Sequence, residues 1–169
     1  MNVYDAILKR RSIRKFKSDL ISDEIIKKLL IAAMAAPSAR NMQPWEFYVI
    51  SNKEVMCKLR NVARSIDFES PLMIIVCGNT DRSITKNDND FWIQDCSAAI
   101  ENILLTATSE NLGTVWCGIY PVMDRVNKVT EIINLPKSII PLGVIHIGYK
   151  DEEKEERTQY NDEYVHYIN

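Results

Sequence analysis

Three arginines and a serine stand together near the start of the chain, in the run Arg10-Arg-Ser-Ile-Arg14. A guanidinium carries a fixed positive charge and several donors in a planar fork, which suits a phosphate dianion. The hydroxyl of Ser12 adds a neutral donor. The run therefore predicts an anion site. A solvated basic helix end, which the helix dipole also favours, explains the same residues equally simply.

Two later segments hold groups that could bind a ring-shaped ligand. In Pro37-Ser-Ala-Arg-Asn-Met-Gln-Pro-Trp45, amide side chains can match the alternating donors and acceptors of a heterocycle's edge, and two prolines limit loop movement. In Gly113-Thr-Val-Trp-Cys-Gly-Ile-Tyr-Pro121, Gly118 allows a ligand or a backbone to approach closely. Each segment also fits an ordinary connection between two elements.

Other common catalytic patterns are missing from the sequence. Its five glycines form neither a phosphate-binding P-loop nor a GxGxxG motif, and two histidines leave little for a metal site or a catalytic triad. No two carboxylates stand out as an acid–base couple. The cysteines form no CxxC pair and are interpreted mainly as buried thiols: Cys57, Cys77, Cys96 and Cys117. The chemistry is therefore expected to rest on a cofactor, with no metal.

The bulk composition indicates a single globular domain over residues 1–169, with 46% hydrophobic and 26% charged residues. No apolar run reaches the roughly 18 residues of a membrane span, and the start does not resemble a signal peptide, so a cytoplasmic location is expected. Residues 1–60 carry 12 Lys and Arg against 6 Asp and Glu, a net of +6 within a chain of net charge −2. This local excess favours an anion site over a nucleic-acid surface, which usually makes a whole domain basic.

Helical and strand patterns alternate along the chain, which predicts an α/β layered sandwich whose strand direction is left open. The expected helices cover residues 3–11, 22–34, 52–66, 91–112 and 124–133. The expected strands cover residues 45–50, 72–77, 114–117 and 139–149, and residues 78–90 are expected to form a long loop.

The C-terminal tail, residues 150–169, is acidic and ends in the aromatic, β-prone run Tyr164-Val-His-Tyr-Ile168. Such a run would leave an exposed strand edge if it were unpaired, which proteins usually avoid. It could pair with its own sheet or with the sheet of a partner, and the sequence leaves both open.

Taken in order, these segments resemble the FMN-dependent nitroreductase family. The likeness starts at Arg10-Arg-Ser-Ile-Arg14 and continues through Pro37–Trp45. It then includes Gln94-Asp-Cys-Ser-Ala-Ala99, the strand Leu112-Gly-Thr-Val-Trp116, Gly148, and the tail pattern of Arg157 with Val165-His-Tyr167. Each motif alone is weak, and their shared order makes the resemblance specific.

The resemblance implies an α+β fold: a three-layer α/β/α sandwich with a mostly antiparallel central sheet. It also implies an intertwined homodimer with C-terminal tail exchange and two FMN sites at its interface. Arg10, Ser12 and Arg157 would hold the FMN phosphate with help from Arg11, and Arg14 would lie near the pyrimidine end of the flavin. Ser38, Ala39, Arg40 and Asn41 would reach the cofactor from the partner subunit. The full set implied to bind the cofactor is Arg10, Arg11, Ser12, Arg14, Pro37, Ser38, Ala39, Arg40, Asn41, Gln43, Cys117, Gly118, Gly148 and Arg157.

The implied activity is an NAD(P)H-dependent flavin oxidoreductase that reduces small electron-poor acceptors, such as nitroaromatics or quinones, in a ping-pong cycle. Met42, Phe91, Trp92 and Tyr120 are expected to line its cleft. The alternatives are reductive dehalogenation or flavin breakdown, for which no lid is visible, and a flavin-binding sensor or storage protein without turnover. Tyr149-Lys150 replaces the family's commoner Tyr-Pro, and the short chain puts any specific substrate in doubt.

Overall fold

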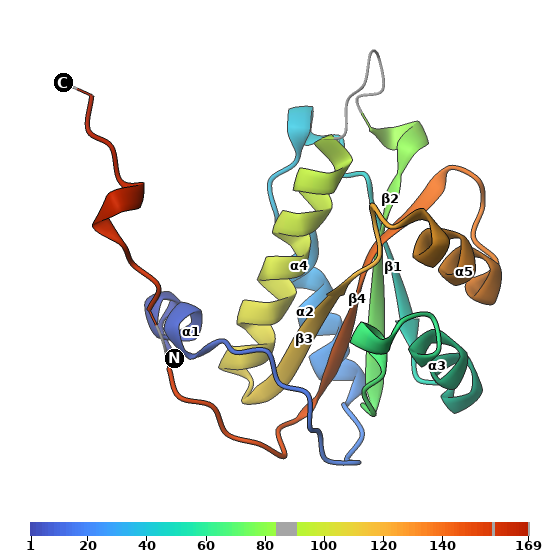
Figure 1. The fold of residues 1–169 in the computed structure, drawn as a ribbon, viewed down its shortest axis with the longest axis horizontal. Helices are drawn as coiled ribbons and strands as arrows, with labels where there is room; N and C mark the ends of the chain where they lie inside the picture. The colour runs from blue at the N-terminus through green and yellow to red at the C-terminus, as the bar shows by residue number, and fades with distance from the viewer. Residues whose placement is uncertain (84–90, 157, 169) are drawn as a thin grey trace.

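A four-stranded sheet forms the middle layer of the molecule in a computed structural model that describes residues 1–83, 91–156 and 158–168 (Figure 1). The strand order is β1-β2-β4-β3, and all three pairings are antiparallel. The strands are β1 (Trp45–Ile50), β2 (Leu72–Asn79), β3 (Leu112–Gly118) and β4 (Ile139–Tyr149). The structure thus supplies the strand directions that the sequence left open.

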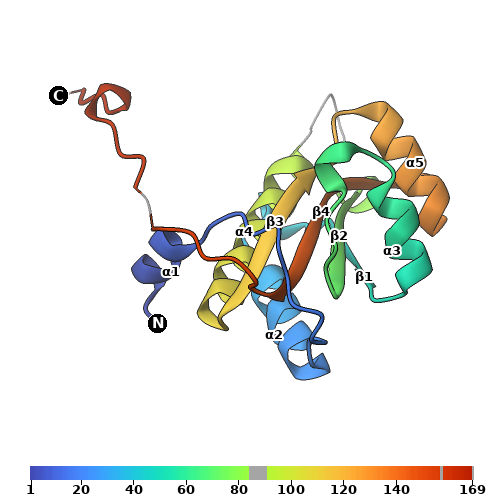
Figure 2. The ribbon, with the colours of Figure 1, turned by 60° about the horizontal axis from the view of Figure 1, so that its bottom comes forward.

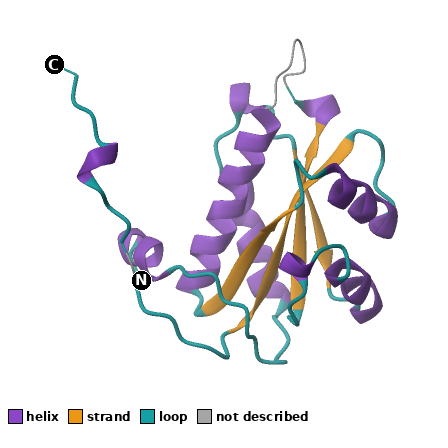
Figure 3. Ribbon diagram, viewed as in Figure 1, coloured by secondary structure: helices purple, strands orange, loops and turns teal. Residues whose placement is uncertain are grey.

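Two pairs of helices cover the two faces of this sheet (Figures 1 and 3). One face carries α2 (Asp23–Met34) and α4 (Phe91–Ser109), and the other carries α3 (Lys53–Arg60) and α5 (Met123–Ile133). Buried side chains of β2 and β4 alternate between two hydrophobic clusters, one under each helix pair, as the period of a strand requires. The expected α+β three-layer sandwich with an antiparallel sheet is confirmed.

Local sequence signals explain most element boundaries. The side chain of Ser22 accepts a hydrogen bond from the Ile25 N–H at the start of α2, and that of Asn52 accepts from Val55 at the start of α3. Asn111 takes a left-handed conformation with φ of 60° just after α4, which asparagine tolerates better than most residues. These are caps and stops that residue type predicts.

Some expected boundaries were wrong. The first helix, α1 (Val3–Lys9), stops before Arg10, whose ψ of 121° is extended, so the arginine run does not continue a helix. The third expected helix divides into α3 and a short 3-10 helix, η2 (Arg64–Ile66). Strand β2 extends to Asn79, and Thr80–Arg82 form another 3-10 helix, η3; the rest of the expected loop, residues 84–90, lies outside the described residues.

The C-terminal segment leaves the body of the molecule beside α1 and extends away from it (Figures 1 and 2). Its only helical turn is η4 (Asp162–Tyr164), among described residues 150–156 and 158–168. Over residues 158–168, the tail forms no ladder with its own sheet, so in this structure the first of the two pairings left open is absent. Within the described residues, no helix is long and apolar enough to cross a membrane.

Candidate functional site

The arginine run crosses the edge of the sheet beside β3. Ser12 forms a parallel bridge with Thr114, and the Ile13 N–H donates to the Thr114 carbonyl at 2.9 Å. Ile13 is buried and packs against Gly113, where a Cβ would lie only 2.7 Å from the Ile13 Cγ2. Gly113 therefore lets the run lie close to the strand, and the buried Ile13 fixes which residues of the run face outward.

A segment from the far end of the chain holds the same run from its other side. Residues 149–156, which we call the strap, lie antiparallel to residues 9–17. Their contacts include Lys17 N–H to the Tyr149 carbonyl at 2.9 Å, Asp151 N–H to the Lys15 carbonyl at 3.0 Å, and Lys154 Nζ to the Ser12 carbonyl at 2.5 Å. The basic start and the acidic end of the chain thus meet.

Glu152 is the central acidic residue of this contact. Its carboxylate accepts from the backbone N–H of Arg14 at 2.5 Å and of Lys15 at 3.3 Å, and it lies 3.3 Å from the Lys154 ammonium. The hydrogen bond from Arg14 is the main cause of a pKa below the ordinary glutamate value. Sequence reasoning missed the strap, although the opposite net charges of the two termini were a usable signal.

Each of the three arginines has a different partner. Arg10 pairs with Glu101 of α4 at 3.8 Å, Arg11 donates to the Glu155 carbonyl of the strap, and the Arg14 guanidinium lies 5.7 Å above the ring of Phe68. The structure brings the run together with β3 but turns its guanidiniums in different directions. Arg11 in particular is engaged by the strap.

Arg14 reaches the end of β3, where the backbone is open. Gly118 is exposed, and a Cβ built there would meet no atom within 4 Å. Arg125 of α5 donates to the Gly118 carbonyl at 2.9 Å, and the charges of Arg14 and Arg125 both act on the neighbouring Cys117. We call Arg14, Cys117, Gly118 and Arg125 the β3 strip: an open backbone within reach of two positive charges.

Cys117 itself contributes backbone rather than a reactive thiol. Its side chain is buried, and burial raises its pKa to about 11 despite the two arginines, so the thiol stays protonated near neutral pH. Cys77 and Cys96 are likewise buried, as expected, but Cys57 is exposed, so the expectation for that residue was wrong. Cys57 lies on the outer side of α3, whose buried residues are Met56 and Leu59.

The Pro37–Gln43 loop has an unusual and well-held backbone. Arg40, Asn41 and Gln43 all have positive φ, between 49° and 57°, a conformation that non-glycine residues adopt only where the surroundings impose it. The Ser38 Oγ accepts from the Gln43 N–H at 3.0 Å, and the buried carboxylate of Asp95 accepts from the Ala39 N–H at 2.9 Å. The loop therefore presents exposed polar side chains on a fixed backbone.

This loop and the arginine run do not meet within one chain. The loop is held at Asp95 and the run at Glu101, and six residues of α4 separate these by about 9 Å along the axis and about 120° around it. Among the described residues, no hydrogen bond or ion pair joins residues 37–43 to residues 10–14. Figure 1 shows the loop near the start of α4 and the run crossing its other end.

The remaining predicted residues have mixed positions. Gly148 is buried, and a Cβ there would lie 2.8 Å from Pro71, so this glycine serves close packing in the chain seen here. Trp92 is only 3% exposed and packs edge-on against Tyr120 at an interplanar angle of 66°, whereas Met42 and Phe91 are exposed. Arg157 lies outside the described residues.

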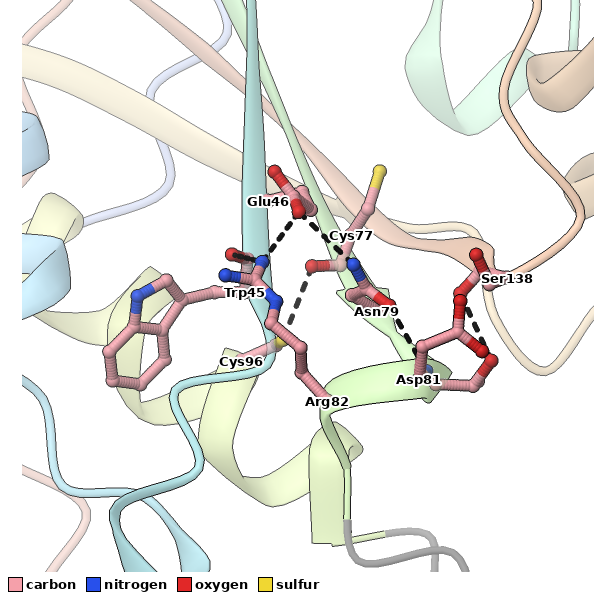
Figure 4. Close-up of polar contacts among 9 residues, drawn as sticks. Trp45, Glu46, Cys77, Asn79, Asp81, Arg82, Cys96 and Ser138 are labelled. Atoms are coloured by element: carbon pink, nitrogen blue, oxygen red, sulfur yellow. Dashed lines mark hydrogen bonds and ion pairs between the residues drawn. The ribbon is translucent and has the colours of Figure 1, made fainter.

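A polar cluster fixes the start of the expected long loop to β1 (Figure 4). Arg82 of η3 donates to the Trp45 carbonyl at 3.1 Å and pairs with the Glu46 carboxylate, which also accepts from Asn79. The Thr80 N–H donates to the Ser138 carbonyl at 2.8 Å. These contacts tie the end of β2 to its neighbours and do not touch the predicted site residues.

A hollow at one end of the sheet does not coincide with the predicted site. It has a volume of about 390 Å³ and lies between residues 16–20, α3 and residues 68–73. None of the predicted cofactor-binding residues lines it. Phe68, whose ring lies under the Arg14 guanidinium, forms part of its wall. Phe68, Arg125 and Glu152 are the site residues that sequence reasoning missed, because each meets the site only through folding of distant segments.

The protein has a mixed α+β fold with an antiparallel sheet. At one edge of that sheet, the β3 strip combines positive charge with a backbone that no side chain covers. The family model described as "Nitroreductase family" matches residues 7–66 and 58–149. The chain therefore belongs to the nitroreductase family, and the resemblance seen in the sequence is confirmed.

Individual relatives agree with this assignment. A protein of Methanothermobacter thermautotrophicus, provisionally named NADH dehydrogenase/NAD(P)H nitroreductase, is 41% identical over 168 residues, which cover 98% of this chain and 86% of the relative. A crystal structure from Parabacteroides distasonis with the same provisional name has a TM-score of 0.91 at 36% identity, covering 99% of this chain and 98% of that one. A structure from Clostridium difficile, named an FMN-dependent nitroreductase, has a TM-score of 0.87 at 30% identity, covering 97% and 98%.

Proposed function

We propose that this protein is an NAD(P)H-dependent oxidoreductase that uses FMN to reduce small electron-poor acceptors such as nitroaromatics or quinones. The β3 strip is the observation that carries the proposal: Gly118 leaves open space against the sheet edge, and the positive charges of Arg14 and Arg125 act on the neighbouring Cys117. The family assignment and the FMN dependence printed for a relative of 30% identity support the cofactor. Bound FMN would supply the two-electron chemistry, since no side chain described in the site is a reactive nucleophile or an acid–base couple.

The residues of the strip fit a flat, anionic group. A backbone with no side chain in front of it accepts a ring, and fixed positive charge favours a ligand that gains negative charge on reduction. Ser12 and Arg10, in the run beside β3, are proposed to hold the phosphate. Arg14 is proposed to lie at the end of the ring that accumulates charge.

We propose further that the protein works as a homodimer whose second copy supplies the Pro37–Gln43 loop. Its fixed backbone and exposed amides suit a ligand, yet among the described residues it makes no hydrogen bond or ion pair with the arginine run of its own chain. Exposed apolar side chains on α1 and the tail indicate a surface for another chain: Val3 and Tyr4 are 73% and 69% exposed, and Tyr167 is 84% exposed. The site is therefore proposed to be complete only when two copies associate.

The same proposal gives the tail a place to pair. Strands β1 and β3 are the two edges of the sheet, and the Ser12 bridge already covers β3. The open edge of β1 is proposed to receive the β-prone tail of the partner. This is the second of the two pairings that the sequence left open.

An absorbance spectrum of the purified protein, followed by anaerobic addition of NADH or NADPH, tests the function. Flavin bands that bleach on addition of either donor, and return with a quinone, are the expected result. The donor that reacts faster identifies the preferred nicotinamide. Flavin bands that persist with both donors would instead indicate a binding protein without turnover. A colourless protein that takes up no added FMN would contradict the proposal altogether.

A further inference from the structure

Phe68 supports Arg14 in a way that the family assignment does not require. The Arg14 guanidinium lies 5.7 Å from the centroid of the Phe68 ring, which places a cation over an aromatic face. Arg14 is otherwise exposed, and a free arginine samples many rotamers. Its contact with an aromatic face limits where the charge can lie.

The Phe68 ring is itself held from another side. It meets the imidazole of His146 on β4 at a centroid distance of 5.6 Å and an interplanar angle of 80°. His146 has no exposed surface, and its Nδ1 lies 2.9 Å from the Ser70 Oγ. Phe68 is thus fixed between the sheet and the guanidinium.

The hydrogen bonds of Ser70 identify the state of that imidazole. The Ser70 hydroxyl donates its one hydrogen bond to the Leu72 carbonyl at 3.1 Å, so its Oγ accepts a hydrogen bond from a protonated Nδ1 of His146. The Nε2 has no hydrogen-bond partner among the described residues. Burial lowers the pKa of His146, and the nearby Ile66 backbone, which raises that pKa, offsets only part of the effect. His146 is therefore neutral, and from its fixed place on β4 it supports the Phe68 ring.

We propose that Phe68 is the positioning residue that sets the place of the Arg14 charge, and thereby tunes the reduction potential of the bound flavin. This rests on the proposed function, because it takes Arg14 to lie at the flavin. Phe68 contacts Arg14 and is not itself part of the β3 strip. Its contribution is therefore electrostatic placement: a mobile guanidinium stabilises the reduced anionic ring less than a fixed one.

Substitution of Phe68 by leucine removes the aromatic face and keeps an apolar side chain. We expect the midpoint potential of the bound flavin to become more negative and the dissociation constant of FMN to rise about two- to fivefold. Phe68→Trp, which keeps a face for the cation, should restore the potential. Phe47→Leu is the matched control, since Phe47 is also half-buried but packs on the opposite face of the sheet.

The potential separates positioning from simple loss of stability. If Phe68→Leu and Phe47→Leu shift the potential equally, or neither shifts it while Arg14→Ala does, the role of Phe68 is contradicted and the flavin function stands. Arg14→Ala combined with Phe68→Leu should shift the potential no further than Arg14→Ala alone. If the unchanged protein binds no FMN, the proposed function fails, which is a different result from failure of the Phe68 role.

Discussion

At the scale of single residues, the site is shaped by where charges are held. The charges of Arg14 and Arg125 both act on Cys117, beside the open backbone of Gly118, while Arg10 and Arg11 are engaged by Glu101 and the strap. The residue types of the run predicted an anion site, but only the structure separates the arginine over Phe68 from its neighbours. One position of the run therefore carries most of the proposed electrostatic role.

Arg14→Ala tests that role directly. We expect weaker FMN binding or slower reduction of a quinone, because the change removes a positive charge beside the open Gly118. Titration of the protein with FMN and steady-state turnover measure the two effects. Arg82→Ala is a charge-matched control far from the strip, where Arg82 contacts Glu46. Equal behaviour of the two variants would remove Arg14 from the site.

His146 gives a prediction for stability against pH. Burial lowers its pKa to about 4, below the ordinary 6.5, so the unfolded chain binds a proton first as the pH falls. The stabilisation from neutral His146 is complete above pH 6.5 and is lost between pH 6.5 and 4, a change of about 3 kcal/mol. Chemical denaturation at a series of pH values measures it. His146→Gln should flatten this step, and an unchanged slope in that variant would contradict the assignment.

At the scale of elements, β3 and its neighbours position the site through two glycines with opposite surroundings. A Cβ at Gly113 would collide with Ile13, whereas a Cβ at Gly118 would meet nothing. Neither glycine has a positive φ, so alanine is tolerated by the backbone at both positions. The two glycines therefore differ in the space that surrounds them: a side chain would be crowded at Gly113 and free at Gly118.

The two alanine variants should therefore separate folding from binding. Gly113→Ala is expected to lower the free energy of unfolding by about 1–3 kcal/mol, because the arginine run must move off the strand. Gly118→Ala is expected to leave stability unchanged while weakening FMN binding, because its methyl group enters the open space. Thermal unfolding and FMN titration of both variants check this. A stable Gly113→Ala protein would show that the run does not depend on close approach.

Much of the element pattern was predictable, because helix and strand periodicity depends on neighbouring residues. Ser22 and Asn52 were recognised as helix starts, and β1 and β4 were expected at their observed bounds. Strand order and direction were not predictable from local pattern. The helix over residues 3–11 was too long because the Ser12 bridge to Thr114 draws the chain into an extended path. Phe68 and Glu152 were missed for the same reason, since their partners are distant in sequence.

At the scale of the whole molecule, one chain keeps the two proposed halves of the site apart. The arginine run is held at Glu101 of α4 and the Pro37–Gln43 loop at Asp95, near the start of the same helix. The tail leaves the body with its aromatic residues exposed. Association of two copies would bring unlike halves together and cover these residues.

Removal of residues 158–169 tests this arrangement. We expect the full chain to be a dimer. The shortened chain should dissociate at higher protein concentrations than the full chain and bind FMN less tightly, because dimerisation and the completed site are both proposed to depend on the tail. Light scattering after size-exclusion chromatography gives the mass, and the circular dichroism spectrum shows whether the fold is kept. A full chain that is monomeric at micromolar concentration yet retains flavin would contradict the two-copy site.

The strap also sets an order of events during synthesis. The arginine run emerges from the ribosome more than a hundred residues before residues 149–156, which help to hold it. At about 5–20 residues per second, that interval lasts roughly 7–30 seconds. Throughout it, the arginines of the nascent chain lack the partners that orient them. We therefore expect capture of the cofactor only after residue 156 has emerged, and a ribosome stalled before residue 149 should hold a nascent chain that takes up none.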